Sequence, residues 1–191
     1  MSTFALSMIL DLDSELKYGH VTDVTIQSYV SKIREKEIEV LKKNDYDLEE
    51  REVFFQGFNK RVHTYGICHL DMRTPMQASI TLTKYLLMQG NGEDLINVIA
   101  HEVLHGLLPF GEHHGYAFKS AMKCLNRELG LHIVIRGHCK LAGAVKPKYE
   151  VYCPDCGMVI GKYYRKVKLV KYPYQYRHKG CNCRLEAREV G

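Results

Sequence analysis

Two histidines and a glutamate stand in the run His101-Glu102-Val103-Leu104-His105, which has the HExxH spacing. On an α-helix, residues four apart project from one face, about 40° apart around the axis. His101 and His105 therefore direct two imidazoles toward one point, where a zinc ion can bind. Glu102 lies beside the open coordination position, where it can take a proton from water and pass it to a leaving amine. This pattern predicts zinc-dependent hydrolysis of a peptide bond.

The alternative is a pair of ordinary helix histidines beside a surface glutamate, because short HExxH matches also arise by chance. The surrounding sequence favours the metal site. The segment 95–108 is almost entirely apolar, which predicts a buried helix. Burying two histidines and a glutamate in such a helix is costly unless they serve a purpose.

A catalytic zinc site requires a third protein ligand. The metzincin pattern needs glycine and histidine at the third and sixth positions after the second histidine, but Leu108 and Gly111 stand there, which excludes that class. Glu128, on the next predicted helix, could serve in the manner of the gluzincins. A histidine in the turn before that helix is the better candidate, because it can fold back over the active-site helix. We rank His114 first and His113 second.

Several elements must position these residues, and together they predict an α+β domain over 1–141. The small sheet is expected to be antiparallel and to pack, with a helix, on the HExxH helix and a second helix. The expected elements are a helix over 23–43 capped by Thr22 or Asp23, strands over 52–58, 62–70 and 79–87, the active-site helix over 95–108 and the second helix over 115–129.

The HExxH run, followed after eight residues by His114-Gly115-Tyr116-Ala117-Phe118-Lys119, resembles the SprT-like (Spartan-like) zinc metalloprotease family. Those proteins carry HExxH followed by a histidine in an HGxxF(K) signature, so the resemblance favours His114 over His113 as the third ligand. It takes in roughly residues 20–187. It implies a zinc endopeptidase whose catalytic ion is held by His101, His105 and His114.

Four cysteines near the C-terminus form two close groups, in a chain without an export signal, which favours metal binding over disulfides. Cys153 and Cys156 have the spacing of a zinc knuckle. The other half-site is either His178 with Cys181, or Cys181 with Cys183. We prefer the first, because a one-residue gap strains chelation of one tetrahedral ion. The family resemblance points the same way, and Cys183 stands where the family usually has glycine. A second, structural zinc is therefore expected.

After about Lys140 prolines and tyrosines become frequent and no helical pattern remains, so we expect a β-rich, zinc-ribbon-like module over 142–191, with its boundary near 142–148. Residues 136–191 hold 13 Lys and Arg against 4 Asp and Glu, a net charge of +9, whereas the whole chain carries +5. Cations alternating with flat rings are typical of single-stranded nucleic-acid binding. The candidate contacts are Lys162, Tyr163, Tyr164, Arg165, Lys166, Lys168 and Lys171.

The alternative for this basic segment is a solvated hairpin whose tyrosines fill a small core. The family resemblance favours DNA, because it implies a zinc module that binds DNA and directs cleavage to DNA-bound proteins. Two further functions stay open: a nucleic-acid-binding module beside a non-catalytic protease-like scaffold, and a peptidase with no DNA partner. The sequence shows neither a signal peptide nor an apolar stretch long enough for a spanning helix, so we expect no membrane partner and a cytoplasmic, or in a eukaryote nuclear, location.

Overall fold

The computed structural model of the chain describes residues 3–61, 64–89, 91–135 and 146–190. These residues belong to two compact α+β units, within Met1–Leu141 and Ala142–Gly191. The predicted boundary near 142–148 lies mostly outside the described residues. Among the helices that are described, none is long and apolar enough to cross a membrane.

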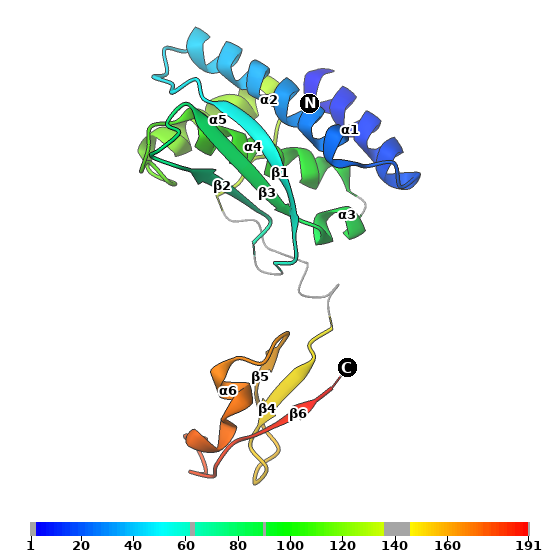
Figure 1. The fold of residues 1–191 in the computed structure, drawn as a ribbon, viewed down its shortest axis with the longest axis vertical. Coiled ribbons are helices and arrows are strands. Elements are labelled where there is room, and N and C mark those ends of the chain that lie inside the picture. Colours follow the sequence, from blue (N-terminus) through cyan, green and yellow to red (C-terminus); the bar gives the residue numbers. More distant parts are fainter. Residues whose placement is uncertain (1–2, 62–63, 90, 136–145, 191) are drawn as a thin grey trace. The chain divides into compact units, whose positions relative to one another are not determined.

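The first unit places its longer helices on one face of a small sheet (Figure 1). The helix predicted over 23–43 is confirmed. Its N-terminus is capped by Thr22, whose side chain accepts the N–H of Thr25. An additional N-terminal helix, absent from our prediction, buries Ala5, Met8 and Leu12. The helices of this layer are α1 (Thr3–Lys17), α2 (Asp23–Lys43), α4 (Gly92–Leu107) and α5 (Tyr116–Leu129).

The sheet has the order β1-β3-β2, with β1 at Glu52–Asn59, β2 at Gly66–Leu70 and β3 at Gln77–Thr83. The β2 and β3 strands pair antiparallel, as expected. The β1 and β3 strands pair parallel, so the expectation of a purely antiparallel sheet is wrong. The reason is topological: β3 lies between β1 and β2, which run in opposite directions, so it can be antiparallel to only one of them.

The third predicted strand extended too far along the chain. β3 ends at Thr83, and the residues that follow form the short helix α3 (Tyr85–Gln89). Leu86 in this helix is buried in the core. A short apolar run satisfies either a strand or a buried helix, so periodicity alone could not separate the two.

The α4 helix is the centre of the first unit. Asn91 caps its start by accepting the N–H of Asp94, and the helix ends at Leu107, just before Pro109. It packs against α1, α2, α5 and all three strands. Its fully buried apolar residues are Leu95, Ile96, Ile99, Ala100, Val103, Leu104 and Leu107. The side chains in HExxH therefore project from a rigid scaffold.

The second unit is a three-stranded antiparallel sheet of order β5-β4-β6, with β4 at Tyr149–Tyr152, β5 at Val159–Tyr163 and β6 at Glu186–Glu189. A short helix α6 (Lys168–Lys171) and a 3-10 turn η2 (Pro173–Gln175) connect the strands, which corrects the expectation that no helix follows residue 140. The buried core is small: Val151, Cys153, Val170 and Leu185.

Candidate metal centres and their surroundings

Three histidines of the first unit bring their Nε2 atoms together. His101 and His105 lie one turn apart on α4, and His114 lies just before α5. The Nε2 of His114 is 2.9 Å from that of His101 and 3.1 Å from that of His105, and the remaining separation is 3.2 Å. The three atoms thus form a nearly equilateral triangle of nitrogen donors.

The size and charge of this triangle suit a metal ion. Tetrahedral zinc with Zn–N bonds of about 2.0–2.1 Å separates its nitrogen ligands by roughly 3.3 Å, close to the separations observed. Burial, followed by the charge of the neighbouring histidines, lowers the pKa of His101 to about 4 and that of His105 to about 3. Neutral rings at pH 7 offer lone pairs rather than protons, as zinc ligands must.

The loop between α4 and α5 selects His114. Glu112 caps α5 by accepting the N–H groups of Ala117 and Phe118 at one carboxylate oxygen. Gly115 makes room for that carboxylate, since a Cβ there would lie 2.4 Å from the oxygen. His113 is exposed, has a positive φ of 46° and lies outside the cluster.

Glu128, the other alternative for the third ligand, also lies outside the cluster. Its carboxylate accepts a hydrogen bond from Arg127 at 2.8 Å, and its side chain is 40% exposed. Of the candidates considered from the sequence, the structure therefore joins only His114 to the HExxH pair.

All three imidazoles rest on one buried phenylalanine. The ring of Phe118 is fully buried, and its centre lies 4.9, 4.4 and 4.9 Å from those of His101, His105 and His114. An apolar floor of this kind limits how far each ring can tilt. Sequence reasoning treated Phe118 as an ordinary apolar helix position and as part of a signature, and did not assign it this contact.

Glu102 points toward β2 rather than into the histidine triangle. Its side chain is 7% exposed, and its carboxylate accepts the backbone N–H of Cys68. Gly66 permits this approach, because a Cβ at that position would lie 2.6 Å from Glu102 Cγ. Burial raises the pKa of Glu102 to about 8, and the Cys68 hydrogen bond opposes part of that rise. The sequence had suggested no role for Gly66.

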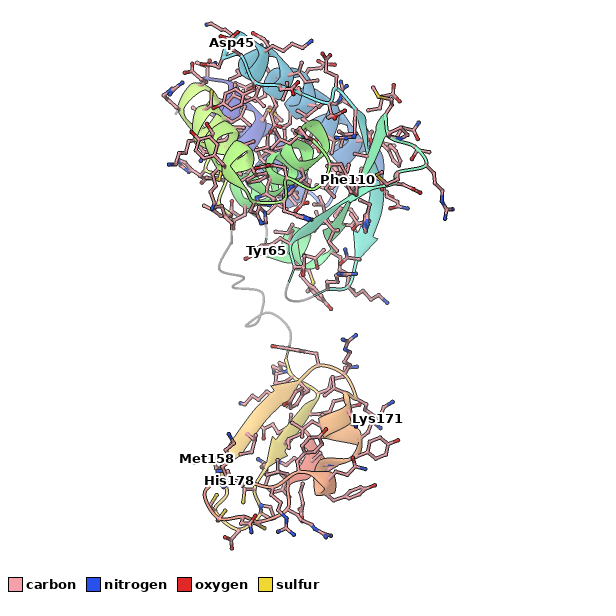
Figure 2. The ribbon with its side chains drawn as sticks, turned by 90° about the vertical axis from the view of Figure 1, so that its left-hand side faces the viewer. Asp45, Tyr65, Phe110, Met158, Lys171 and His178 are labelled. Atoms are coloured by element: carbon pink, nitrogen blue, oxygen red, sulfur yellow. The ribbon has the colours of Figure 1, made fainter. Side chains whose placement is uncertain are left out.

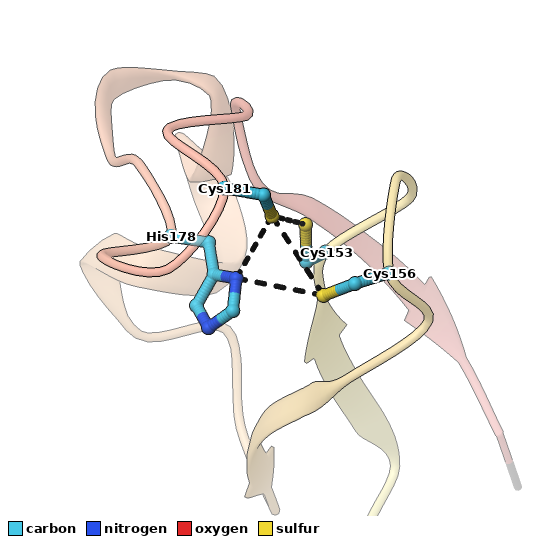
Figure 3. Close-up of side chains that lie close together, drawn as sticks. All are labelled: Cys153, Cys156, His178 and Cys181. Atoms are coloured by element: carbon cyan, nitrogen blue, oxygen red, sulfur yellow. Dashed lines mark hydrogen bonds between the residues drawn. The ribbon is translucent and has the colours of Figure 1, made fainter.

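The second cluster joins Cys153, Cys156, His178 and Cys181, the four residues chosen from the sequence (Figure 3). The Sγ atoms of Cys156 and Cys181 lie 3.8 Å apart, and those of Cys153 and Cys181 lie 3.3 Å apart. His178 contributes Nδ1, which lies 3.5 Å from Cys156 Sγ and 3.0 Å from Cys181 Sγ. These separations resemble the edges of a tetrahedral zinc site with Zn–S bonds of about 2.3 Å.

The pKa values of two thiols in this cluster shift in opposite directions. Hydrogen bonds, first from the backbone N–H of Cys156, lower the pKa of the Cys153 thiol to about 6. The pKa of Cys181 rises to about 12, because its thiol hydrogen-bonds to that of Cys153. A bound cation would allow both to be thiolates. Cys183 lies outside the group, with its Sγ directed to the Arg184 carbonyl at 3.5 Å.

The residues predicted to contact nucleic acid differ in exposure, because the cations are exposed and the two tyrosines are half-buried. Lys162 pairs with the Glu150 carboxylate at 3.2 Å. Tyr163 packs against the small core, and Tyr164 is half-buried. Lys166 places its Nζ 5.7 Å from the centre of the Tyr149 ring. All five candidate cations are exposed: Lys162, Arg165, Lys166, Lys168 and Lys171.

A different group of tyrosines is exposed in the same unit. Tyr172, Tyr174 and Tyr176 are 44%, 55% and 37% exposed, and the rings of Tyr172 and Tyr174 meet edge to face at 6.4 Å. They follow directly on Lys171, which lies away from His178 and Met158 in this unit (Figure 2).

The histidine cluster, its adjoining glutamate and the packed helix that carries them define a metallopeptidase-like domain. A family model confirms this class and names it: the SprT-like family matches residues 35–137, more than half of the chain. The chain belongs to the SprT-like family. A search of curated proteins gave no match.

Proposed function

We propose that the chain is a zinc-dependent endopeptidase that acts on DNA-associated proteins. The observation that carries the peptidase activity is the triangle of three Nε2 atoms within 3.2 Å of one another, beside the buried Glu102. A zinc ion held there supplies Lewis acidity to the scissile carbonyl and to water. His101, His105 and His114 hold the ion.

Glu102 handles the proton in this proposal. Its carboxylate takes a proton from the attacking water and delivers it to the nitrogen of the departing amine. Burial raises the pKa of Glu102 to about 8 in the metal-free chain, and a zinc ion nearby would lower it toward the charged form that acts as a base. The hydrogen bond from Cys68 N–H and the close approach at Gly66 hold the carboxylate against β2.

The substitution Glu102→Gln separates catalysis from metal binding. It should abolish cleavage of an unfolded protein substrate while zinc content remains at two equivalents, since Glu102 is outside both clusters. His114→Ala should remove about one equivalent of zinc together with activity, and His113→Ala should preserve both. Loss of one zinc equivalent in Glu102→Gln, or full activity in that variant, would contradict the assignment.

We propose that the second unit holds a structural zinc ion and binds single-stranded DNA. The exposed cations and the exposed rings of Tyr172 and Tyr174 supply the two ingredients for this binding: charges for phosphates and flat surfaces for unpaired bases. Because Tyr163 packs against the small core and Tyr164 is half-buried, we assign stacking to the later tyrosines.

Titration of labelled single-stranded and duplex DNA at several salt concentrations tests this partner. The double substitution Lys168→Glu with Lys171→Glu should weaken binding and flatten its salt dependence, because fewer phosphate contacts form on binding and fewer counterions are released. Tyr174→Ala should weaken binding with little change in salt slope. Lys43→Glu, at an exposed position of α2, is the matched charge control.

The remaining functions give distinct outcomes. Wild-type DNA affinity in the lysine variant at low salt would remove this DNA-binding surface. Proteolysis that DNA does not stimulate, with no measurable DNA binding, would favour a peptidase without a DNA partner. DNA binding without any cleavage at full zinc occupancy would favour a non-catalytic scaffold.

A further inference from the structure

A short extended segment after α5 runs along α4 and reaches the histidine cluster. We call residues 131–134 the strap. Leu131 and Ile133 are buried, at 2% and 1% exposure, whereas His132 and Val134 face outward. Successive residues of an extended segment face opposite sides, so this alternation determines which backbone groups of the strap point toward α4.

Three successive turns of α4 each hold the strap through one side chain. Glu93 pairs with His132 Nδ1 at 2.7 Å, and Asn97 Oδ1 accepts the N–H of His132 at 2.7 Å. His101 Nδ1 lies 2.9 Å from the carbonyl oxygen of Val134. Residues 93, 97 and 101 are four apart, so they share one face of the helix.

The Val134 carbonyl determines which nitrogen of His101 carries the proton. A carbonyl oxygen only accepts, so Nδ1 of His101 must be the donor. In the neutral ring Nε2 then keeps its lone pair, directed at the Nε2 atoms of His105 and His114. The strap thereby presents His101 in the tautomer that a metal requires.

Asn126 fixes the residue just before that carbonyl. From α5, its Nδ2 donates to the Ile133 carbonyl at 2.9 Å, and its Oδ1 accepts the Ile133 N–H at 2.8 Å. This paired contact satisfies both backbone groups of a buried residue. With Ile133 fixed by α5 and His132 fixed by Asn97, little freedom remains for the carbonyl of Val134.

We propose that Asn126 is a positioning residue for the catalytic metal site: by holding Ile133 it holds the Val134 carbonyl, which orients the ring and tautomer of His101. The proposal rests on the proposed function, because it requires a metal at the three histidines. Asn126 lies on α5 and is not itself one of the three residues of the histidine triangle.

Chelator competition on the intact chain measures the effect. Asn126→Ala should weaken zinc binding at the histidine cluster by about tenfold, the low end of the effect of losing an outer hydrogen-bond partner of a metal ligand, because it displaces the Val134 carbonyl and does not remove it. Zinc at the Cys153 cluster should stay at its wild-type affinity, which gives an internal control. Arg127→Ala, an exposed neighbour on α5 whose partner is the surface residue Glu128, should leave both affinities unchanged.

A second measurement separates positioning from a loss of general stability. In the zinc-loaded protein, the ring N–H of His101 at Nδ1 should give a slowly exchanging NMR signal, because it is hydrogen-bonded to Val134. Asn126→Ala should broaden or lose that signal while the other histidine signals persist. Asn126→Asp keeps the acceptor for the Ile133 N–H but not the donor, so it should give an intermediate zinc affinity.

The outcomes distinguish this proposal from the proposed function. Failure of the wild-type chain to bind zinc at the three histidines would overturn the metal site itself. Wild-type zinc binding that Asn126→Ala leaves within twofold, with the His101 signal retained, would overturn the positioning role alone. A variant with a lower unfolding midpoint but unchanged affinity and signal would likewise restrict Asn126 to a structural part.

Discussion

The two metal-ligand clusters are built in opposite ways. The histidine triangle stands on α4 and α5, whose apolar faces belong to a continuous core, and a buried phenylalanine supports all three rings. The cysteine cluster stands on loops at the edge of a unit whose buried core is only Val151, Cys153, Val170 and Leu185, so one ligand is itself a core residue. The first unit can form its site before metal arrives, whereas the second needs the metal to hold its loops together.

Removal of zinc gives the largest expected difference between the units. A strong chelator should unfold residues 146–190, because about fifty residues with so small a core rarely fold without metal or disulfides. The first unit should stay folded. Amide NMR spectra measure both at once, and Cys153→Ser should reproduce the collapse of the second unit alone. Retention of dispersed signals from the second unit would contradict the comparison.

The substitution Phe118→Ala tests whether the core supports the histidine triangle. Truncating a fully buried phenylalanine costs about 3–5 kcal/mol of the free energy of unfolding. Because its ring contacts all three imidazoles, zinc affinity there should fall as well. Denaturant unfolding and zinc titration measure the two effects. Ala121→Gly, on the same helix but without these contacts, should lower stability only.

The substitution Gly66→Ala tests whether β2 positions Glu102, the proposed catalytic carboxylate. The added methyl would meet Glu102 Cγ at 2.6 Å and must displace it. A shift of about 1 Å in a reacting group can lower turnover on the order of a hundredfold. Zinc content should remain normal, since Glu102 is outside the triangle. Ile67→Ala, the next position on β2, is the control.

The smallest expected effect is a change in the free energy of unfolding caused by a substitution at Glu37. This α2 residue is fully buried, and neither carboxylate oxygen has a hydrogen-bond partner. Burial raises its pKa well above the ordinary 4.5. The folded state therefore retains the proton to higher pH than the unfolded state does, so the stability penalty is absent below about pH 4.5 and grows as pH rises toward the folded-state pKa.

Glu37→Met should therefore stabilise the first unit by about 1–3 kcal/mol at pH 8 and by less at pH 5. Urea unfolding followed by helical circular dichroism at the two pH values checks the sign. Glu35→Met, at an exposed position of the same helix, should show little pH-dependent gain. An equal effect at both pH values would mean that folding does not raise the pKa of Glu37.

Part of each cluster could be predicted from spacing because metal ligands must converge. His101 and His105 follow from one helical turn, and Cys153 with Cys156 follows from knuckle spacing. The choice of His114 over His113, and of His178 with Cys181 over Cys181 with Cys183, also depended on the family resemblance. The α1 helix could have been found as well, since Ala5, Met8 and Leu12 recur at helical intervals. The acidic residues of α1 obscured this pattern. One of them, Asp13, accepts the N–H of Gly92 at the start of α4.

The remaining features depend on contacts between distant segments. No local sequence pattern indicates that β3 pairs with β1, that Glu102 packs against Gly66, or that Lys162 forms an ion pair with Glu150. Basic and aromatic residues in the tail were visible in the sequence. Which of them face solvent depends on the packing of a small core, and composition contains no information about that.

The ring nitrogen that each histidine turns toward its cluster differs between the two units. The three histidines on α4 and before α5 present Nε2, whereas His178 presents Nδ1. A zinc ion in the first unit leaves protons on Nδ1 atoms, and one in the second leaves a proton on Nε2. The two kinds of imidazole have different nitrogen chemical shifts and proton couplings. Occupancy of each site can therefore be followed separately in one tube, on an unmodified chain.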